Sequence, residues 1–160
     1  MVGLLQLDPS TLGHTALQFS NISIGRVLGR GRFCTAFEST LASVASSGSV
    51  VAKVFHSYHD SVMKCEKGVL ITLAQHNVGN VPHYEADEKS SCGEFNVLVV
   101  SPLGEVVLPI RGGSRTVGEH WATLVMTLQR THGLGIAHRD VKPGNIFVTE
   151  DRIILNDWGS

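Results

Sequence analysis

The sequence predicts a single domain of the α+β class, in which a five-stranded antiparallel sheet carries one helix and a smaller part follows. Three observations predict this class. Several short segments alternate apolar and polar residues, two longer segments have helical spacing, and 160 residues suit about one domain with its own core. The 42% of hydrophobic residues can fill that core, and 13 basic against 14 acidic residues argue against a nucleic-acid-binding surface.

Alternating or β-branched apolar segments predict the strands of the sheet. They are residues 22–28, 33–38, 50–55, 83–86 and 95–101. Residues 1–22 have no such pattern and are assigned as an N-terminal lead-in, while the Ser-rich residues 39–49 are expected to form a loop. A polar Asp-Glu-Lys-Ser-Ser turn at 87–91 is expected to separate the last two strands.

Helical spacing replaces alternation in residues 60–75. The residues that share one face of this helix are Val62, Glu66, Val69, Leu70 and Leu73. Gly68 lies inside the helix and weakens it by up to about 1 kcal/mol relative to alanine.

A second helix is predicted over residues 116–132, after a loop at 109–114. Thr116 and Glu119 form a capping box at its start. Its apolar stripe consists of Trp121, Leu124, Val125 and Leu128. The chain then continues as a loop at 138–145 and a short hairpin with strands at 146–149 and 153–155.

A lysine and a glutamate each lie among apolar residues, where a charged side chain needs an oppositely charged partner. Lys53 lies between apolar neighbours on a strand, and Glu66 lies within the apolar face of its helix, where an unpaired charge costs several kcal/mol. The two are therefore candidates for an ion pair. A lysine at a sheet edge and a glutamate at the margin of its helix remain the alternatives.

The most specific motif is His138-Arg139-Asp140-Val141-Lys142-Pro143-Gly144-Asn145. Asp140 can accept a proton from a hydroxyl, Lys142 can neutralise phosphate charge, and Asn145 offers an oxygen to a hard metal ion. Asp157-Trp158-Gly159 follows and supplies the anionic metal ligand that this loop lacks.

The turn that begins at Gly29 brings glycines to a position between two strands, where backbone amides can approach an anion. Alone it equally describes an ordinary hairpin turn, and because a strand follows it, a Rossmann unit is not expected. His56 and His59 are three residues apart, but no third ligand has a clear spacing for a metal site.

In order and spacing, these motifs resemble the eukaryotic protein kinase family of the Ser/Thr type. The resemblance covers residues 23–160 and implies an N-lobe at about 23–101 and an incomplete C-lobe at about 102–160. It implies ATP and Mg²⁺ as cofactors and a protein with Ser or Thr acceptors as substrate, with no nucleic-acid or membrane partner.

The resemblance also implies a role for each site residue. Asp140 is the catalytic base, Lys142 assists at the γ-phosphate, and Lys53 holds the α- and β-phosphates and pairs with Glu66, while Asn145 and Asp157 bind Mg²⁺. The residues expected to contact the nucleotide are Leu28, Gly29, Arg30, Gly31, Arg32, Phe33, Cys34, Ala36, Ala52, Lys53, Ser101 and Leu103. Ser101 and Leu103 would do so through the backbone of the hinge.

The chain departs from the family pattern at four points. Cys34 replaces the third glycine, Ala36 replaces a valine, and Trp158 replaces the phenylalanine of Asp-Phe-Gly. The sequence also ends at Ser160, from which we expect a kinase domain cut short, inactive by itself, with an exposed apolar surface on the 116–132 helix. The alternatives are a kinase-like module that binds a nucleotide or partner without catalysis, and a small-molecule phosphotransferase.

The sequence shows neither a secretory signal nor a membrane-spanning segment. Its three cysteines, Cys34, Cys65 and Cys92, are widely spaced and odd in number, which favours reduced thiols. We therefore expect an intracellular, cytoplasmic protein.

Overall fold

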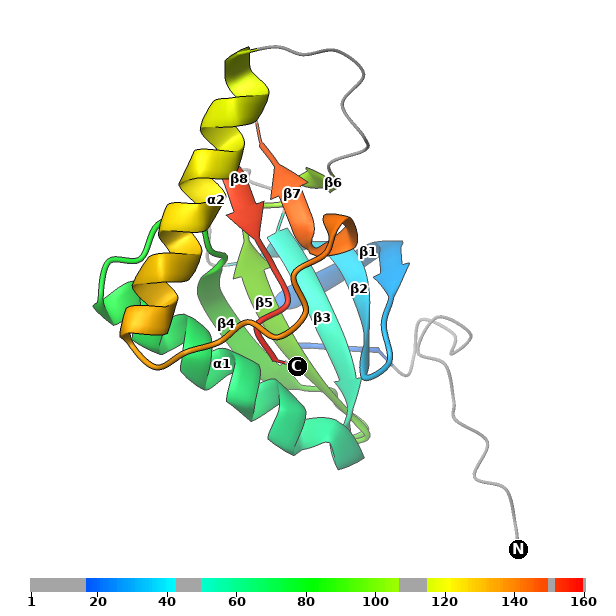
Figure 1. The fold of residues 1–160 in the computed structure, drawn as a ribbon. Coiled ribbons are helices and arrows are strands. Elements are labelled where there is room, and N and C mark those ends of the chain that lie inside the picture. The colour runs from blue at the N-terminus through cyan, green and yellow to red at the C-terminus, as the bar shows by residue number, and fades with distance from the viewer. Residues whose placement is uncertain (1–16, 43–49, 107–114, 150–151, 160) are drawn as a thin grey trace, which may run out of the picture.

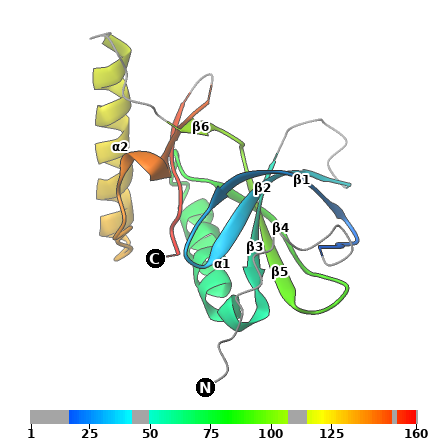
Figure 2. The same ribbon diagram turned by 90° about the vertical axis from the view of Figure 1, so that its right-hand side faces the viewer.

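A computed structural model describes residues 17–42, 50–106, 115–149 and 152–159 of the chain. An antiparallel sheet has the strand order β1-β2-β3-β5-β4 and is curled (Figures 1 and 2). Its strands are β1 (Ile22–Arg30), β2 (Cys34–Leu41), β3 (Val50–His56), β4 (His83–Lys89) and β5 (Phe95–Ser101). The α+β class and the five-stranded antiparallel sheet are confirmed.

Two of these strands, β2 and β4, extend three residues beyond their predicted ends. β2 continues through residues 39–41, which we had assigned to the Ser-rich loop, because they pair with β1 and β3; residues 43–49 of that loop lie outside the described residues. β4 includes Asp87, Glu88 and Lys89, which we had placed in a turn. β4 is an edge strand with one face exposed to solvent, so polar residues are tolerated there. The turn itself lies at 90–94, with Gly93 at φ +75°.

The end of the lead-in is held against the sheet. The backbone N–H groups of Ser20 and Asn21 donate to the carboxylate of Glu88, at 2.5 and 3.2 Å, and the N–H of Ser91 donates to the carbonyl of Gln18 at 2.9 Å. Residues 18–21, which precede β1, are therefore held by contacts with β4 and the β4–β5 turn.

The two faces of the sheet bury two separate hydrophobic clusters. On one face, Val51 and Phe55 of β3 and Leu98 of β5 pack against α1 (Asp60–Gln75). On the other face, Ala52 and Val54 pack with residues that include Phe37, Val97 and Val99. This separation follows from the strand period of two residues, which sends neighbouring side chains to opposite faces.

Helix α1 has the bounds that the sequence predicted, and the 3₁₀ turn η1 (Ser57–His59) precedes it. Its buried side chains are Met63, Glu66, Leu70 and Leu73. Val62 and Val69, which we had placed on the same face, are only half-buried, and Met63 takes the more central position. The buried stripe thus follows the spacing i, i+3, i+7, i+10 through Glu66.

Replacing Gly68 with alanine is expected to stabilise the protein by about 0.5–1 kcal/mol, because Gly68 lies in the helix interior and a Cβ there meets no atom within 4 Å. Thermal unfolding measures this as a rise in Tm of about 1–4 °C. The matched control is Gly93→Ala, which is expected to lower Tm because a side chain at φ +75° is strained. A lower Tm for Gly68→Ala would contradict the prediction.

A smaller sheet and a second helix complete the fold (Figure 2). The strands β6 (Glu105–Val106), β7 (Ile146–Val148) and β8 (Ile153–Leu155) form the second sheet in that order, and a short 3₁₀ turn, η2 (Pro143–Asn145), leads into β7. Helix α2 (Arg115–Gly133) lies beside β8, on the side away from the five-stranded sheet. The hairpin of β7 and β8 was predicted, whereas β6 was not.

The buried face of α2 differs from the predicted stripe. Leu124, Thr127 and Thr131 are buried, while Trp121 and Val125 are 54% and 51% exposed. The exposed apolar surface that we expected on this helix is therefore present, and Met126, at 57% exposure, adds to it. The helix begins at Arg115, so Thr116 is not the residue before its first turn as a capping box requires; the side chains of that turn lie outside the described residues.

Neither helix in the described part of the chain combines the length and the apolar character needed to cross a membrane.

Candidate active site

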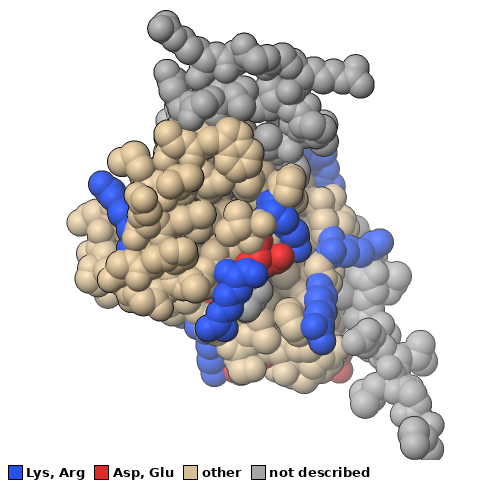
Figure 3. Space-filling model, in the orientation of Figure 1, with Lys and Arg blue, Asp and Glu red and all other residues tan. Residues whose placement is uncertain are grey.

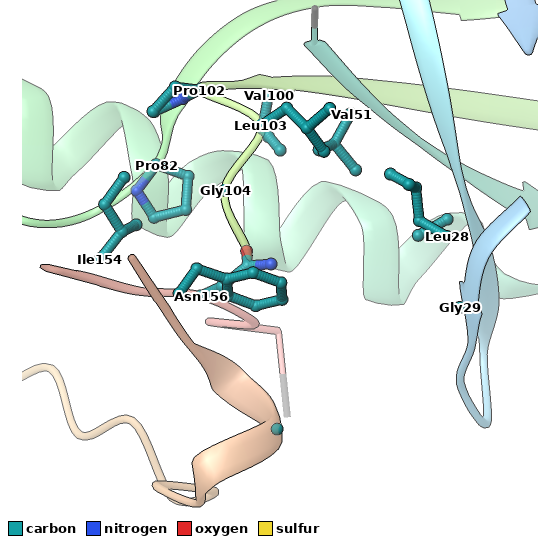
Figure 4. A pocket seen from close by; sticks show the side chains of 13 residues that line it. Leu28, Gly29, Val51, Pro82, Val100, Pro102, Leu103, Gly104, Ile154 and Asn156 are labelled. Carbon is teal, nitrogen blue, oxygen red and sulfur yellow. The ribbon is translucent and has the colours of Figure 1, made fainter. Parts of the chain in front are cut away.

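A pocket of about 550 Å³ lies between the two sheets (Figure 4). Apolar side chains and glycines dominate its wall: Leu28, Gly29, Ala36, Val51, Pro82, Val100, Pro102, Leu103, Gly104, Gly144, Phe147, Ile154 and Asn156. In Figure 4, Val51, Val100 and Leu103 lie together on one side, with Ile154 and Asn156 opposite them. The volume and the apolar lining suit a flat heterocycle of the size of a purine.

One predicted nucleotide contact does not line the pocket, whereas the residue before it does. Ala52, which we had expected to contact the nucleotide, lies on the far face of the sheet with Val54 and Val97. Val51 lines the pocket instead. The physical reason is strand alternation: Lys53 faces the site, so the residue two positions before it shares that face and the residue one position before it does not.

Apart from Cys34 and Lys53, the other predicted nucleotide contacts divide into three groups. Leu28, Gly29, Ala36 and Leu103 line the pocket. Arg30, Gly31, Arg32 and Phe33 form the end of the β1–β2 hairpin, where the N–H of Gly31 donates to the carbonyl of Cys34 at 2.9 Å. Ser101 is not among the pocket-lining residues; its hydroxyl donates to the carboxylate of Glu85, and a cis peptide bond joins it to Pro102.

Asn156 is a pocket residue that sequence reasoning missed. Its Oδ1 atom is buried and has no hydrogen-bond partner among the described residues, and Figure 4 shows the residue on the pocket wall. No sequence signal marked it, because neighbouring residues of a strand point to opposite faces and a place beside Asp157 therefore does not predict a place in the cleft. Pro82 was missed as well, and its position in the loop after α1 carried no such signal.

Lys53 joins two carboxylates that are far apart in the sequence. Its Nζ lies 2.5 Å from Glu66 Oε1 on α1 and 3.4 Å from Asp157 Oδ1 after β8. The side chains of Lys53 and Glu66 are only 5% and 3% exposed, so the predicted pair is buried. Burial by itself would lower the pKa of Lys53, but the charges of Glu66 and then Asp157 outweigh it and raise the pKa, so the ammonium stays protonated.

Cys34 lies close to the same charges. Burial raises the pKa of its thiol to about 12, and the positive charge of Lys53 opposes that effect only in part. The thiol is therefore protonated at neutral pH and behaves as a small, partly buried side chain.

The loop before β7 brings together the three polar residues predicted from its motif. Lys142 Nζ donates to Asp140 Oδ2 at 2.6 Å, and Asn145 Nδ2 donates to the same oxygen at 3.0 Å and to the Asp140 carbonyl at 2.9 Å. The hydrogen bond from Lys142 lowers the pKa of Asp140, with a further contribution from Asn145. Asp140 is thus an ionised carboxylate, partly open to solvent, as a proton acceptor requires.

Buried rings hold this loop against the segment that follows β8. His138 Nε2 lies 2.7 Å from the Asn156 carbonyl, and the N–H of Asp140 donates to His138 Nδ1 at 3.3 Å. Burial lowers the pKa of His138, so the ring is neutral with its proton on Nε2. Trp158, the departure from the family pattern, packs at 4.5 Å from this ring and donates its N–H to the Leu155 carbonyl at 2.7 Å.

Two backbone features bring Asp157 toward Lys53. Asp157 has φ +70°, a conformation that turns its side chain away from the line of β8. Gly159 then passes close to α1, where a Cβ would lie 3.0 Å from the Cβ of Glu66. A glycine at 159 therefore lets this segment lie directly against the Lys53–Glu66 pair.

The donor set fits a hard divalent cation. Asn145 uses its amide nitrogen within the loop, which leaves its amide oxygen as a ligand, and the Asp157 carboxylate is 43% exposed and contacts Lys53 at the long distance of 3.4 Å. Carboxylate and amide oxygens are the ligands that Mg²⁺ prefers. On the face in Figure 3, acidic atoms lie near the centre with Lys and Arg side chains around them, an arrangement suited to a polyanion that carries a metal ion.

Comparisons with known proteins agree with this geometry at the level of the family. No protein-family model matches the sequence. The chain is similar to human 3-phosphoinositide-dependent protein kinase 1, at 29% identity over 154 residues, and to serine/threonine-protein kinase ksg1 of Schizosaccharomyces pombe, at 26% over 152 residues, and each alignment covers 88% of this chain. It is also 26% identical to CBL-interacting protein kinase 10 of Oryza sativa subsp. japonica over 146 residues, which cover 85% of this chain.

The chain spans 26%, 25% and 31% of the lengths of these three relatives. The similarity therefore concerns only a part of each relative. Together, these matches support a relationship between this chain and the serine/threonine protein kinases.

Proposed function

We propose that the chain carries the nucleotide site of an ATP- and Mg²⁺-dependent kinase that transfers the γ-phosphoryl group to Ser or Thr hydroxyls of proteins. One observation carries the proposal: Lys53 lies between Glu66 and Asp157, residues separated from it by 13 and 104 positions. A buried ammonium with carboxylates on both sides, on the same face of β3 as the pocket residue Val51, suits a triphosphate whose base occupies that pocket.

Each residue then has a task that its surroundings support. The apolar pocket holds the base, and the amides of the turn at 29–34 and the ammonium of Lys53 receive the phosphates. Asn145 and Asp157 would hold Mg²⁺, which supplies charge neutralisation between the phosphates when bound. Glu66 keeps Lys53 in place.

The transfer step depends on the loop at 138–145. Asp140 orients the acceptor hydroxyl and takes its proton, and its hydrogen bond to Asn145 fixes the carboxylate for that task. Lys142, bonded to the same carboxylate, lies where it can stabilise charge on the transferred group.

Binding of MgATP tests the proposal directly, and Asp157→Ala is the informative variant. We expect Mg²⁺ to strengthen ATP binding to the natural chain, and Asp157→Ala to reduce that Mg²⁺-dependent gain by about tenfold or more while ATP binding in EDTA changes little. Isothermal titration calorimetry with and without Mg²⁺ measures both quantities.

The matched control is Asp87→Ala, since Asp87 lies on β4 and pairs with Lys67 rather than with the site. It should leave the Mg²⁺-dependent gain unchanged. Failure of the natural chain to bind ATP with or without Mg²⁺ would contradict the proposal. Nucleotide binding without transfer to any peptide or protein would favour a non-catalytic module, and transfer to small molecules alone would favour the small-molecule phosphotransferase.

A further inference from the structure

A chain of ring contacts runs from the tip of the β1–β2 hairpin to the sheet. Phe33 meets the ring of His59 edge-on at 5.2 Å, and His59 meets Tyr58 at 4.3 Å. Tyr58 stacks on His56 at 4.1 Å, and His56 meets Phe95 edge-on at 5.2 Å. We name these five rings the aromatic chain.

The aromatic chain begins at a half-buried residue and ends in the core. Phe33 and His59 are each half-buried, whereas Phe95 has no exposed surface and belongs to the cluster on the far face of the sheet. His56 pairs with Phe95 in the register of β3 and β5, and Asn96, the next residue of β5, donates to Asp60 at the start of α1. The middle of the aromatic chain is thus fixed by the sheet and by the first turn of α1.

The hairpin tip belongs to an exposed edge of the sheet. Most of β1 from Gly25 onward is exposed, and β1 is an edge strand with two shifts in its pairing with β2. Beyond the hairpin, Phe33 contacts His59 and, like Cys34, packs against the core cluster around α1. Arg32 places its guanidinium 5.1 Å from the same ring. Phe33 is therefore one of the residues that tie the tip to the body of the protein.

We propose that Phe33 and His59 are positioning residues that hold the turn at 29–34 over the phosphates of the bound nucleotide. The inference rests on the proposed function, because it assigns the turn to the triphosphate. Backbone amides bind an anion well only when they already point toward it, and a tied turn does not lose conformational freedom on binding. Because His59 directly precedes α1, the tie also links the turn to the helix that carries Glu66.

The aromatic chain also accounts for the two histidines of this segment. His56 and His59 have the spacing of two metal ligands, but no group of three or more His, Cys, Asp or Glu side chains that could hold a metal ion occurs among the described residues. Their rings contact other rings instead. A ring that acts by packing can be exchanged for phenylalanine without loss, which separates this role from one that needs the imidazole nitrogens.

The test compares His59→Ala with His59→Phe in the natural chain by two measurements. Amide hydrogen exchange of residues 29–34 in the free protein should become faster in His59→Ala and return to the natural rate in His59→Phe. The affinity for MgATP should fall about two- to tenfold in His59→Ala, the range expected for one aromatic contact, and recover in His59→Phe, whereas the affinity for adenosine should not change. His76→Ala, an exposed histidine at the other end of α1, is the matched control and should change neither quantity.

Each outcome decides a separate part of the inference. Equal exchange in the natural chain and His59→Ala would overturn the tie. If exchange becomes faster in His59→Ala but its affinity for MgATP does not change, the positioning role is overturned. The same holds if His59→Ala loses as much affinity for adenosine as for MgATP. If His59→Phe behaves like His59→Ala, the ring contact is not the cause of the tie. If the natural chain does not bind MgATP, the proposed function and the positioning role fail, while the exchange comparison still decides whether the rings hold the turn.

Discussion

Replacing Asp140 with alanine is expected to reduce phosphoryl transfer by about 10²–10⁴-fold and to leave MgATP binding within about twofold of the natural value. The carboxylate is ionised at neutral pH, since the hydrogen bond from Lys142 lowers the pKa of Asp140 below its usual value, and Asn145 donates to the same oxygen. Mass spectrometry of peptide acceptors after incubation with MgATP, on this chain and on any longer protein that contains it, measures the loss.

Asp140→Asn is the matched control for shape. It keeps the size of the side chain and one oxygen for Asn145 but removes the proton acceptor, so its transfer rate should fall nearly as far as that of the alanine variant. Transfer by Asp140→Ala at the natural rate would remove Asp140 from the reaction. A parallel loss of MgATP affinity would assign it to binding instead.

Replacing Lys53 with methionine is expected to lower the free energy of unfolding by about 3–5 kcal/mol, the largest effect on stability that we predict. The change removes the ammonium 2.5 Å from Glu66 and leaves that carboxylate buried without its partner. Urea denaturation, followed by circular dichroism, measures the change through the midpoint and slope of unfolding.

Two variants separate loss of the pair from loss of the lysine side chain. The double variant Lys53→Met with Glu66→Gln removes both charges and should recover most of the lost stability. Lys67→Met breaks the pair of Lys67 with Asp87, which is about one third exposed, and should cost at most about 1 kcal/mol. A loss for Lys53→Met no larger than that for Lys67→Met would contradict the prediction.

The elements that could be predicted from the sequence are those with a strong local pattern. The bounds of α1, β5 and β8 agree with the prediction because an unbroken apolar period marks each of them. β4 was predicted too short because its last residues are polar, and β6 was missed altogether because this two-residue strand forms only by pairing with β7, which is distant in the sequence. Local propensity contains no information about that partner.

Helix α2 shows a second limit of sequence patterns. Its predicted stripe included Trp121 and Val125, which are exposed, and omitted Thr127 and Thr131, which are buried. Apolar character alone does not reveal which face meets β8. The hydroxyl of Thr127 donates to the Thr123 carbonyl and that of Thr131 to the Leu128 carbonyl, each at 3.0 Å. These hydrogen bonds lower the free-energy cost of burying the two threonines, so a pattern of apolar residues does not reveal them.

The candidate site could be predicted in part because its charges need partners. A glutamate inside an apolar face predicted its pairing with Lys53, and the two are in contact. The prediction for Ala52 was wrong by one position along the strand, which places its side chain on the opposite face of the sheet. The pocket wall from Pro82 to Asn156 could not be predicted, because it depends on packing between two sheets that no short sequence pattern encodes. The roles of the individual residues in catalysis remain predictions.

The short connection between β5 and β6 limits how the two sheets can move. Only residues 102–104 separate the strands, and a second link joins the sheets where the N–H of Leu155 donates to the Asn80 carbonyl at 2.9 Å. These two links and the contact between Lys53 and Asp157 hold together the two sheets that form the walls of the pocket. A longer segment in place of residues 102–104 would therefore change the width of the pocket and leave both sheets intact.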